Sequence, residues 1–476
     1  MPVIKFDLSW IDTTIIILYF VFILFLGFYV SYKSKKNKNK HSDDFLLAGR
    51  QLTLPLFVGT LVATWYGNIL GVGEFIYNDG IVAWVCFGLP YYIAAGFFAG
   101  LIAKKIRKEG AKSIPEQLLN KFGKKSSWIA SVIILLITIP AAYILMLGVI
   151  LQIFTGYELW ITITIGAILS VAFLFTGGFK ADVITNSAQF VLMYIGFIAL
   201  LVFTFINFGS PQLMLNNLPE SHLLFQGNYS FQYIAVWFII SLQTFVDPSF
   251  HQRCAAAKTP EIAQKGIITS IIFWILFDFL TLFTGLYSKA YISISEPMMS
   301  FPILGNLVLP EFWKGIFIIT LLATIMSTLN SYTFLSAATL GNDILLPILK
   351  LKSNFKKIKI ETLTRIGLFL STTIAIIMAI LLPSAVGLIY KTSSIAVPGL
   401  LFPLLVSYSK KYYIESRKVF LIMICGAIVS LIWTILYELE NSNAIGIEIF
   451  RNVEPMLPGI IITFLLTITF IKPIKN

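Results

Sequence analysis

Three glycines interrupt an apolar run near the start of the chain, Ala63-Thr64-Trp65-Tyr66-Gly67-Asn68-Ile69-Leu70-Gly71-Val72-Gly73-Glu74. Glycine weakens a helix, and a helix that breaks leaves the carbonyl groups of its last turn without donors. Those carbonyls lie at the negative end of the half-helix dipole. The run therefore predicts that Ala63 and Tyr66 offer carbonyl oxygens to a dehydrated monovalent cation. The alternative is a close-packing seam at Gly67 and Gly71, which the spacing alone favours.

A stripe of hydroxyl side chains follows one face of a later apolar run. Thr324, Ser327, Thr328 and Ser331 recur at helical spacing. A polar stripe does not face lipid, so it is expected to point into the protein. The hydroxyls of Ser327 and Thr328, with the Thr324 carbonyl, could complete the cation shell begun by the glycine-rich run. In the alternative, each hydroxyl bonds to the carbonyl four residues before it in its own helix.

A few acidic side chains fall within apolar runs, where ionisable groups are functional candidates by default. Glu74 lies just beyond the expected break and Asp278 lies in the middle of a run. Asp182 and Asp247 fall near predicted helix ends, where contact with water explains them equally well. The residues expected beside a substrate cavity are Trp65, Gly67, Glu74, Tyr77 and Gln243. Such a mixture suits a small polar organic solute, and Glu74 slightly favours one with a positive group.

The composition requires these residues to sit in a membrane. The 476 residues are 57% hydrophobic and 12% charged, with a mean hydropathy of +0.86, whereas soluble domains carry about 25% charged residues. The apolar runs are continuous, which predicts an all-α polytopic protein embedded in the lipid bilayer, not a barrel. We expect about thirteen transmembrane helices, at 10–32, 54–78, 81–103, 128–154, 158–176, 182–207, 230–249, 266–288, 313–342, 363–383, 386–408, 418–437 and 455–471.

The basic residues predict how these helices are oriented. Of the 35 Lys and Arg residues, 30 fall in alternate loops or at the C-terminus, which places those loops in the cytoplasm. The N-terminus is then outside and the C-terminus inside the cell membrane. The net charge of +12 is thus explained by orientation, without nucleic acid. The first apolar run is expected to remain as a helix, since no small-residue cleavage site follows it.

The spacing of the helices indicates an internal repeat. Helices two to six (54–207) and seven to eleven (230–408) form two sets of five. Because five is odd, the second set is inverted in the membrane relative to the first. The first helix (10–32) and the last two (418–471) would be additions to this core of two inverted five-helix repeats.

Four segments resemble the sodium:solute symporter family, in order and over roughly residues 10 to 410. They are Asp43-Asp44-Phe45-Leu46-Leu47-Ala48-Gly49-Arg50, the stretch from Gly177-Gly178 to Gln189, Gln252-Arg253-Cys254-Ala255-Ala256-Ala257-Lys258, and Ala323–Ser331 followed by Asn342-Asp343-Ile344. The resemblance implies the leucine-transporter-type fold, with one sodium ion between the second and ninth helices. Its ligands would be the carbonyls of Ala63, Tyr66 and Thr324 and the hydroxyls of Ser327 and Thr328.

Two positions depart from patterns in that family. Asn186 stands where many members have an aspartate. This chain therefore has no carboxylate at that position to bind a cation. Trp65 stands where proline carriers have an acid, which argues against a proline carrier. The resemblance implies a secondary active transporter that couples sodium, as the co-transported ion, to a small polar organic solute by alternating access.

Three other functions remain as alternatives. A proton-coupled carrier of the same fold would use a titrating acid, Glu74 or Asp278. A transporter-derived sensor or receptor would need a signalling domain, and few residues follow the last predicted helix. A membrane-embedded enzyme would need clustered acids or a metal site, and the sequence shows neither, so an enzyme is not expected.

Overall fold

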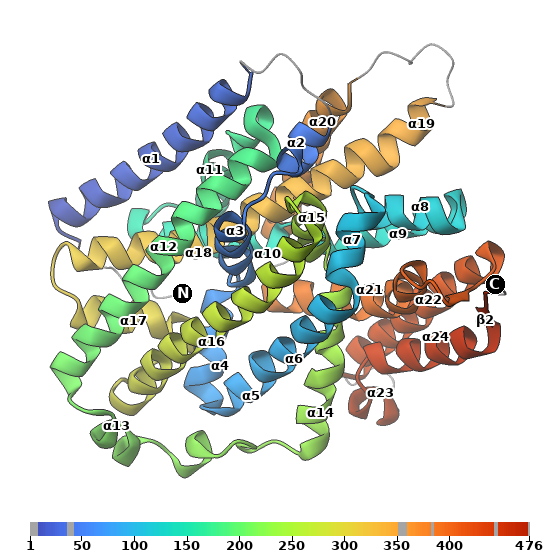
Figure 1. Cartoon of the computed structure of the whole chain (residues 1–476). Helices are drawn as coiled ribbons and strands as arrows, with labels where there is room; N and C mark the ends of the chain where they lie inside the picture. Colours follow the sequence, from blue (N-terminus) through green and yellow to red (C-terminus); the bar gives the residue numbers. More distant parts are fainter. Residues whose placement is uncertain (1–7, 36–41, 351–358, 382–384, 442–445, 475–476) are drawn as a thin grey trace.

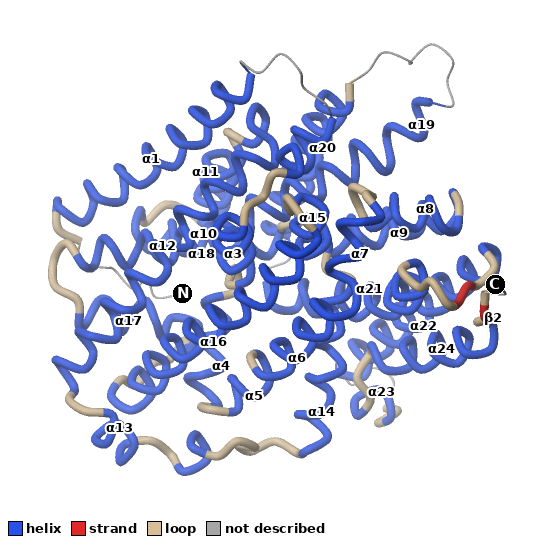
Figure 2. The backbone as a smooth tube through the Cα atoms, in the orientation of Figure 1, coloured by secondary structure: helices blue, strands red, loops and turns tan. Residues whose placement is uncertain are grey.

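Helices account for almost all of the structure, a computed structural model that describes residues 8–35, 42–350, 359–381, 385–441 and 446–474 (Figures 1 and 2). The strands β1 (Tyr412–Tyr413) and β2 (Lys472–Pro473) pair antiparallel. The helices of the first half are α1 (Trp10–Lys35), α2 (Ser42–Leu47), η1 (Ala48–Arg50), α3 (Leu54–Trp65), α4 (Ile69–Asp79), α5 (Val82–Phe87), α6 (Leu89–Phe98), η2 (Ala99–Ala103), α7 (Lys104–Glu109), α8 (Ile114–Phe122), α9 (Lys124–Thr138), α10 (Ala141–Thr155), α11 (Leu159–Val171), α12 (Leu174–Phe208), α13 (Pro211–Asn217) and η3 (Glu220–Leu223). Those of the second half are α14 (Phe231–Ile240), η4 (Ser241–Phe245), α15 (Pro248–Ala256), α16 (Pro260–Tyr291), η5 (Pro297–Met299), α17 (Ser300–Val308), α18 (Trp313–Ala338), η6 (Thr339–Leu345), α19 (Leu346–Lys350), α20 (Ile360–Leu381), α21 (Ala385–Ser407), α22 (Ser416–Asn441), α23 (Ile449–Asn452) and α24 (Met456–Phe470).

The predicted all-α polytopic class is confirmed, but the number thirteen is not. Among the described residues, eight helices are long and apolar enough to cross a membrane, or up to ten if each of two bent pairs forms one span. The other three predicted spans coincide with shorter apolar helices, Leu159–Val171, Thr392–Ser407 and Met456–Phe470. About 20 residues are needed to cross the hydrocarbon core, so length alone does not establish Leu159–Val171 and Met456–Phe470 as spans, whereas Thr392–Ser407 is the later part of the longer α21.

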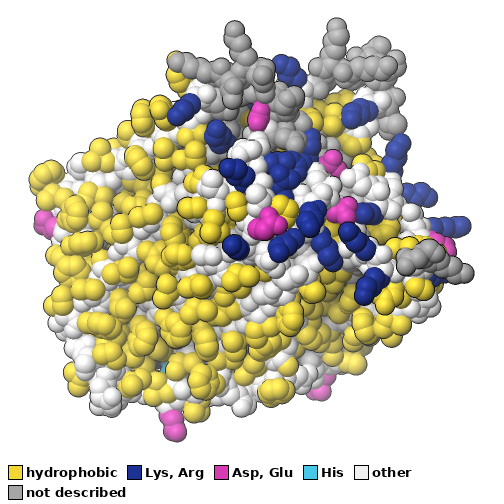
Figure 3. Space-filling model, in the orientation of Figure 1, with side chains coloured by type: hydrophobic (Ala, Val, Ile, Leu, Met, Phe, Trp, Pro, Cys, Tyr) yellow, Lys and Arg dark blue, Asp and Glu magenta, His cyan; other side chains and the backbone are white. Residues whose placement is uncertain are grey.

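The outer surface is suited to lipid. Large apolar side chains are exposed along the outer helices, as Phe25 on α1 and Phe464 on α24 illustrate. Figure 3 shows hydrophobic side chains over most of the visible face, whereas Lys and Arg gather at the upper right, toward the end where Figure 1 has α7, α8 and α19. A contiguous apolar surface of this extent is stable only when lipid covers it.

The predicted break in the second span is confirmed. α3 ends at Trp65, α4 begins at Ile69, and the two helices are bent by 59°. Tyr66, Gly67 and Asn68 form the turn between them. Since a helix cannot continue through this bend, the carbonyls in the last turn of α3 lose their helical donors, as expected from the glycines.

A second break, which the sequence analysis missed, lies in the seventh span. Residues 231–245 and 248–256 are bent by 40° at Asp247, whose Oδ1 accepts a hydrogen bond of 2.7 Å from the Ser249 amide at the start of α15. The prediction that this span ends at residue 249 and is followed by a loop is wrong, because residues 248–256 form a buried helix. Its polar residues suggested a loop, but their partners lie inside the protein.

The broken second span packs in the middle of the bundle, where α3, α12 and α18 lie against one another (Figure 1). α12 and α18 come especially close at Gly196, where an added Cβ would lie 1.9 Å from Oγ1 of Thr320. That approach lets the Thr320 hydroxyl lie 2.9 Å from the Leu192 carbonyl of α12. Small residues and interhelical hydrogen bonds of this kind hold membrane helices together, so α18 is fixed against the neighbours of the break.

A segment between α12 and α14 docks against the far end of α4 through His222. The His222 Nε2 lies 3.1 Å from the Tyr77 carbonyl, and the His222 carbonyl accepts a hydrogen bond of 2.9 Å from the Ile81 amide. Gly80 has φ 71°, and a side chain there would meet the His222 backbone. The segment is therefore seated on the turn that ends α4.

Lowering the pH is expected to loosen this docking. Burial lowers the pKa of His222, an effect to which nearby Lys289 adds and which Asp79 and the Tyr77 carbonyl oppose. A histidine whose pKa is lowered when docked contributes its full stability above its free pKa, near 6.5, and loses it progressively below that pH. Hydrogen exchange at the Ile81 amide should be faster at pH 5 than at pH 7, relative to the intrinsic rate. His222→Gln should remove this difference; an unchanged difference would contradict the assignment.

Candidate functional site

The hydroxyls of α18 occupy the carbonyls that the break in the second span exposes. The Ser327 hydroxyl donates to the Ala63 carbonyl at 2.9 Å, and the Thr328 hydroxyl donates to the Thr64 carbonyl at 2.8 Å. In an unbroken helix these two carbonyls would accept from the amides four residues later. Two side chains of another helix thus replace the backbone donors that the break removed.

The hydroxyls of the stripe on α18 have different hydrogen-bond partners. The Thr324 hydroxyl bonds to the Thr320 carbonyl of its own helix at 2.7 Å, so the alternative of local bonding is correct at this position. The Ser327 hydroxyl lies 2.9 Å from the Thr324 carbonyl as well as from that of Ala63. The Ser331 hydroxyl joins a separate cluster described below. Of these four hydroxyls, those of Ser327 and Thr328 donate to backbone carbonyls in the last turn of α3.

Four of the five predicted cation ligands lie side by side in the interior. Ala63, Thr324, Ser327 and Thr328 are at most 1% exposed. The Ser327 hydroxyl bonds to the carbonyls of Ala63 and Thr324, and Thr328 bonds to the carbonyl of Thr64, the residue after Ala63. Tyr66 follows α3 directly, with φ −94° and ψ 21°, so its carbonyl also belongs to the open end of the helix. These groups are neutral oxygens at the end of an unwound helix, the donor type that binds sodium in secondary transporters. The donor set fits a sodium ion.

Gly67 lets the two helices approach at this point. An added Cβ would lie 2.5 Å from Cβ and Oγ1 of Thr328, so the close-packing alternative is also correct for this glycine. Gly71 differs, because an added Cβ would meet the Asn68 side chain of its own segment at 2.7 Å. The expected seam is therefore a contact at one position, and it coincides with the break.

A buried ion pair adjoins these oxygens. The Arg253 guanidinium lies 3.7 Å from the Asp182 carboxylate, and both side chains are fully buried. Nη2 of Arg253 donates to the hydroxyls of Thr60, Thr64 and Ser331 at 3.0, 2.8 and 2.8 Å. Thr64 links this cluster to the site above, because its carbonyl accepts from Thr328. Four helices, α3, α12, α15 and α18, thus meet around one guanidinium.

Asn186 completes the cluster on α12. Its Nδ2 donates to Oδ1 of Asp182 at 3.1 Å and to the Ser331 hydroxyl at 2.9 Å. An aspartate at this position would add a second carboxylate beside the first, whereas the amide supplies donors. From the sequence, contact with water is as good an explanation of Asp182 as a functional role. That explanation is wrong, because the Asp182 side chain is fully buried. The available signals were the spacing of Asp182 and Asn186 by one helical turn and the single arginine of α15.

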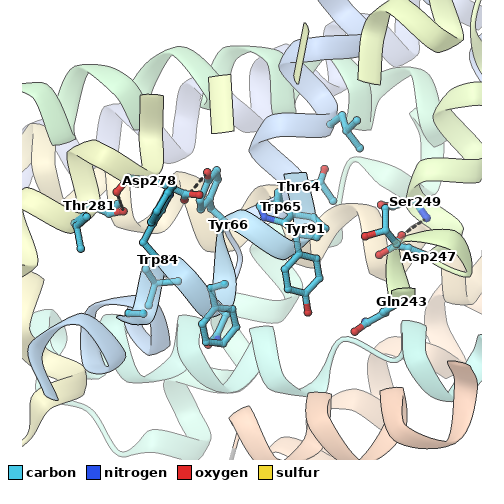
Figure 4. Close-up of a pocket in the computed structure, with 18 of the residues that line it drawn as sticks. Thr64, Trp65, Tyr66, Trp84, Tyr91, Gln243, Asp247, Ser249, Asp278 and Thr281 are labelled. Atoms are coloured by element: carbon cyan, nitrogen blue, oxygen red, sulfur yellow. Dashed lines mark hydrogen bonds between the residues drawn. The ribbon is translucent and has the colours of Figure 1, made fainter. Parts of the chain in front are cut away.

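A cavity of about 160 Å³ lies between the two breaks (Figure 4). One water needs roughly 10–15 Å³ on this measure, so the cavity has room for a small organic molecule. Its walls come from both broken spans and from α5, α6, α10, α16 and α18. The lining residues are Leu61, Thr64, Trp65, Tyr66, Asn68, Val72, Ile76, Ala83, Trp84, Phe87, Gly88, Tyr91, Tyr143, Gln243, Thr244, Asp247, Ser249, Asp278, Thr281, Leu282 and Tyr332.

Two of the five predicted substrate residues, Trp65 and Gln243, line this cavity. Gly67, Glu74 and Tyr77 are not among the residues that line this cavity, and their assignment to the substrate site stays a prediction. The lining residues at the start of the second half-helix are Asn68, in the turn before α4, and Val72 and Ile76 of α4. They are spaced one helical turn apart, so Glu74 and Tyr77 lie on other faces of α4. The hydroxyl of Tyr77 lies instead 2.9 Å from the Ile292 carbonyl and from the Ile294 amide.

Asp278 lines the cavity from α16, as its position in the middle of an apolar run suggested. Its Oδ1 accepts a hydrogen bond of 2.8 Å from the Tyr66 hydroxyl, and its Oδ2 accepts one from the Tyr92 hydroxyl. The Tyr66 hydroxyl also lies 3.0 Å from the Trp274 carbonyl. Tyr66, whose carbonyl is a predicted ion ligand, therefore also bonds through its side chain to an acid of the cavity.

The fold is of the leucine-transporter type. The chain superposes on a sodium-coupled sialic acid symporter in its outward-open state with a TM-score of 0.80 at 16% identity, covering 99% of this chain and 100% of that one. It also superposes on a transporter of the nucleobase-cation-symport-1 family with a TM-score of 0.54 at 14% identity, covering 90% and 96% of the two chains. At these identities the likeness establishes the fold alone.

The chain belongs to the sodium:solute symporter family, which it matches over residues 45–413. It is 24% identical over 426 residues to high-affinity choline transporter 1 of Drosophila melanogaster and 25% identical over 319 residues to sodium-coupled monocarboxylate transporter 2 of Bos taurus. These alignments cover 83% and 64% of the chain, but 67% and 51% of the two relatives. A 30% identical match to the choline transporter of Caenorhabditis elegans spans 38% of the chain and a third of that protein. The predicted membership of the sodium:solute symporter family is therefore confirmed.

Proposed function

We propose that this chain carries a small polar organic solute across the cell membrane together with one sodium ion bound between α3 and α18. The observation that supports this most directly is the pair of hydrogen bonds from Ser327 and Thr328 to the carbonyls of the broken helix. The ligands would be the carbonyls of Ala63, Tyr66 and Thr324 and these two hydroxyls.

Sodium binding would exchange one set of contacts for another. In this structure the hydroxyls of Ser327 and Thr328 donate to carbonyl oxygens of α3. With the ion, the hydroxyls turn their protons away, and their lone pairs and the carbonyls face the same charge. The ion then joins α3 to α18 directly, which orders Trp65 and Tyr66 at the cavity wall. A ligand shifts a conformational equilibrium only by its different affinities for the two states, and this site exists only while the two helices are together.

One sodium ion per cycle is sufficient to drive accumulation. Moving one charge through 100 mV releases about 2.3 kcal/mol, and a tenfold sodium gradient adds about 1.4 kcal/mol. The sum of about 3.7 kcal/mol corresponds to roughly 500-fold accumulation of a neutral solute. A second ion is not needed for uptake on this scale.

The proposal includes a topology of thirteen spans and two inverted repeats. The first helix of each proposed repeat, at 54–207 and 230–408, is the broken one, and the two breaks face one cavity. That symmetry is what inverted-repeat transporters use, with the site at the repeat interface. The gathering of basic side chains at one end (Figure 3) supports placing that end, and the C-terminus, in the cytoplasm.

Removing either hydroxyl is expected to weaken sodium binding at least tenfold. Ser327→Ala and Thr328→Ala each delete one proposed ligand, and both leave a carbonyl of α3 without its donor. Binding of radioactive sodium to the purified full chain, with potassium as competitor, measures the loss without knowledge of the solute. Thr333→Val is the matched control, because the Thr333 hydroxyl on α18 is buried and bonds to the Leu329 carbonyl of its own helix.

The proton-coupled alternative gives the opposite pattern. It predicts uptake that follows a pH gradient without sodium, ignores Ser327→Ala and fails in Asp278→Asn. Sodium binding unchanged in both hydroxyl variants would overturn the proposed site. The relatives do not decide the solute, since their names include choline, monocarboxylate and sialic acid carriers.

A further inference from the structure

We infer that the cavity between the two breaks selects a small organic cation with an alkylated ammonium group. This assignment rests on the proposed function and narrows its substrate class. Three features of the cavity support it: its aromatic rings, its acidic side chains and its position relative to the proposed ion site.

Aromatic rings form a large share of the cavity wall. They are Trp65, Tyr66, Trp84, Phe87, Tyr91, Tyr143 and Tyr332. Two pairs meet at an angle: the rings of Trp65 and Tyr91 have centroids 5.2 Å apart and planes at 69°, and those of Tyr143 and Tyr332 are 5.5 Å apart at 60°. Angled rings present π faces in more than one direction. Ring faces attract cations, and quaternary ammonium groups are recognised in this way.

The charged residues of the wall are both acidic. Asp247 and Asp278 line the cavity, and no Lys or Arg is among its lining residues. In Figure 4, Asp278 lies at the left and Asp247 at the right, with Trp65 and Tyr91 between them. Within the described part of the chain, neither acid makes an ion pair. A wall of this kind repels an anionic substrate, because it has no basic side chain to balance the charge that the substrate would add to those of the two acids.

Asp247 is the acid suited to hold the charged group. Each of its oxygens accepts one hydrogen bond, Oδ1 from the Ser249 amide at 2.7 Å and Oδ2 from the Tyr332 hydroxyl at 2.8 Å. A carboxylate oxygen has a second lone pair, so this acid is fixed in place and still able to face a cation. The arginine of the same helix, Arg253, forms its ion pair with Asp182 instead.

The proposed sodium ion would not reverse this preference. Ala63, Thr324, Ser327 and Thr328 are absent from the cavity lining, and Tyr66 is the one proposed ligand among the lining residues. The ion therefore lies behind α3, on the side of α18, and not in the cavity. A substrate carboxylate could not use it as a direct partner. An alkylated ammonium needs only ring faces and a nearby acid, and both are present.

The experiment compares ligands that differ in charge and not in shape. Choline, its neutral carbon isostere 3,3-dimethylbutan-1-ol and pyruvate are titrated into the purified full chain in sodium and in potassium, with thermal stability and calorimetric binding as readouts. We expect choline to bind in sodium at least tenfold more tightly than the isostere, and pyruvate not to bind. Equal binding of choline and its isostere, preferential binding of pyruvate, or no binding of choline would overturn the assignment.

Variants test which groups recognise the charge. Asp247→Asn should weaken choline binding at least tenfold, whereas Asp79→Asn, an acid of α4 outside the cavity lining, should not. Tyr91→Leu should lose affinity that Tyr91→Phe retains, because only the latter keeps the ring. The wild-type comparison of choline with its isostere needs no variant, so it decides the matter even if Asp247→Asn does not fold.

Failure of this inference is distinguishable from failure of the proposed function. Radioactive sodium binds to the full chain without any organic ligand if the ion site is correct. Sodium binding that is lost in Ser327→Ala, with no preference for choline, would remove the cation assignment and leave the sodium site. Choline binding that is independent of sodium would remove the coupling and leave the cation cavity.

Discussion

Replacing Arg253 with methionine is expected to destabilise the protein by about 3–5 kcal/mol, because the Asp182 carboxylate would remain buried without its counter-charge. The structure buries both side chains completely. The hydroxyls of Thr60, Thr64 and Ser331 would lose the guanidinium to which they are bonded. Thermal unfolding of the purified protein in detergent measures the loss. Sodium binding should fall as well, because Thr64 belongs to both clusters.

A double variant separates the ion pair from simple packing. Arg253→Met combined with Asp182→Leu removes both charges, and exchange of a buried pair for apolar residues is often neutral or stabilising. The double variant should therefore recover much of the stability that the single variant loses. Lys180→Met is the control, since Lys180 is an exposed cation two residues from Asp182. A double variant no more stable than Arg253→Met would show that charge compensation is not what holds these helices.

The part of the site that could be predicted from the sequence depends on local patterns. The break in the second span follows from glycines at 67, 71 and 73, because helix propensity acts within a turn or two. The inward face of α18 follows from hydroxyls spaced at the helical period. These two patterns meet in the structure, where Ser327 bonds to Ala63 across 264 positions of sequence. The family resemblance named the same residues.

The part that could not be predicted depends on contacts between distant segments. Arg253 looked like a loop residue because α15 is polar, yet its partners are Thr60, Asp182 and Ser331, contributed by three other helices. The break at Asp247 has no glycine to mark it. Only the folded chain shows that a buried carboxylate caps the following half-helix there.

The residues that line a cavity are harder to predict from the sequence than the position of a helix break, for a geometric reason. Proximity to the break in sequence suggested Gly67, Glu74 and Tyr77, but a helix directs successive side chains about 100° apart, so proximity does not fix the face. The rotation of α4 is set by its neighbours: Gly73 lies against Ser300 and Phe301 of α17, where an added Cβ would be within 3 Å of both. Such packing cannot be read from the apolar pattern of one segment.

Gly67→Ala is expected to lower both stability and sodium affinity, although two effects of the change oppose each other. Replacing glycine by alanine stabilises a protein by about 0.4–1 kcal/mol through the unfolded state where the backbone permits it, and Gly67 has no positive φ that would forbid it. The added Cβ, however, would lie 2.5 Å from Cβ of Thr328. That atom is next to the backbone and cannot rotate away. Overpacking of this kind costs about 1–3 kcal/mol, so the clash should dominate.

Gly96→Ala is the matched control, because Gly96 lies in α6 and an added Cβ there meets nothing within 4 Å. Only the unfolded-state effect then remains, and this variant should be as stable as the wild type or slightly more so. Thermal unfolding and binding of radioactive sodium are measured on both variants. They should show a loss of stability in Gly67→Ala and no loss in Gly96→Ala. Because the clash moves Thr328 away from the Thr64 carbonyl, the loss of sodium affinity in Gly67→Ala should exceed what the loss of stability alone explains. Wild-type stability and sodium affinity in Gly67→Ala would mean that α3 and α18 are not in contact at the break, and the ion site between them could not exist.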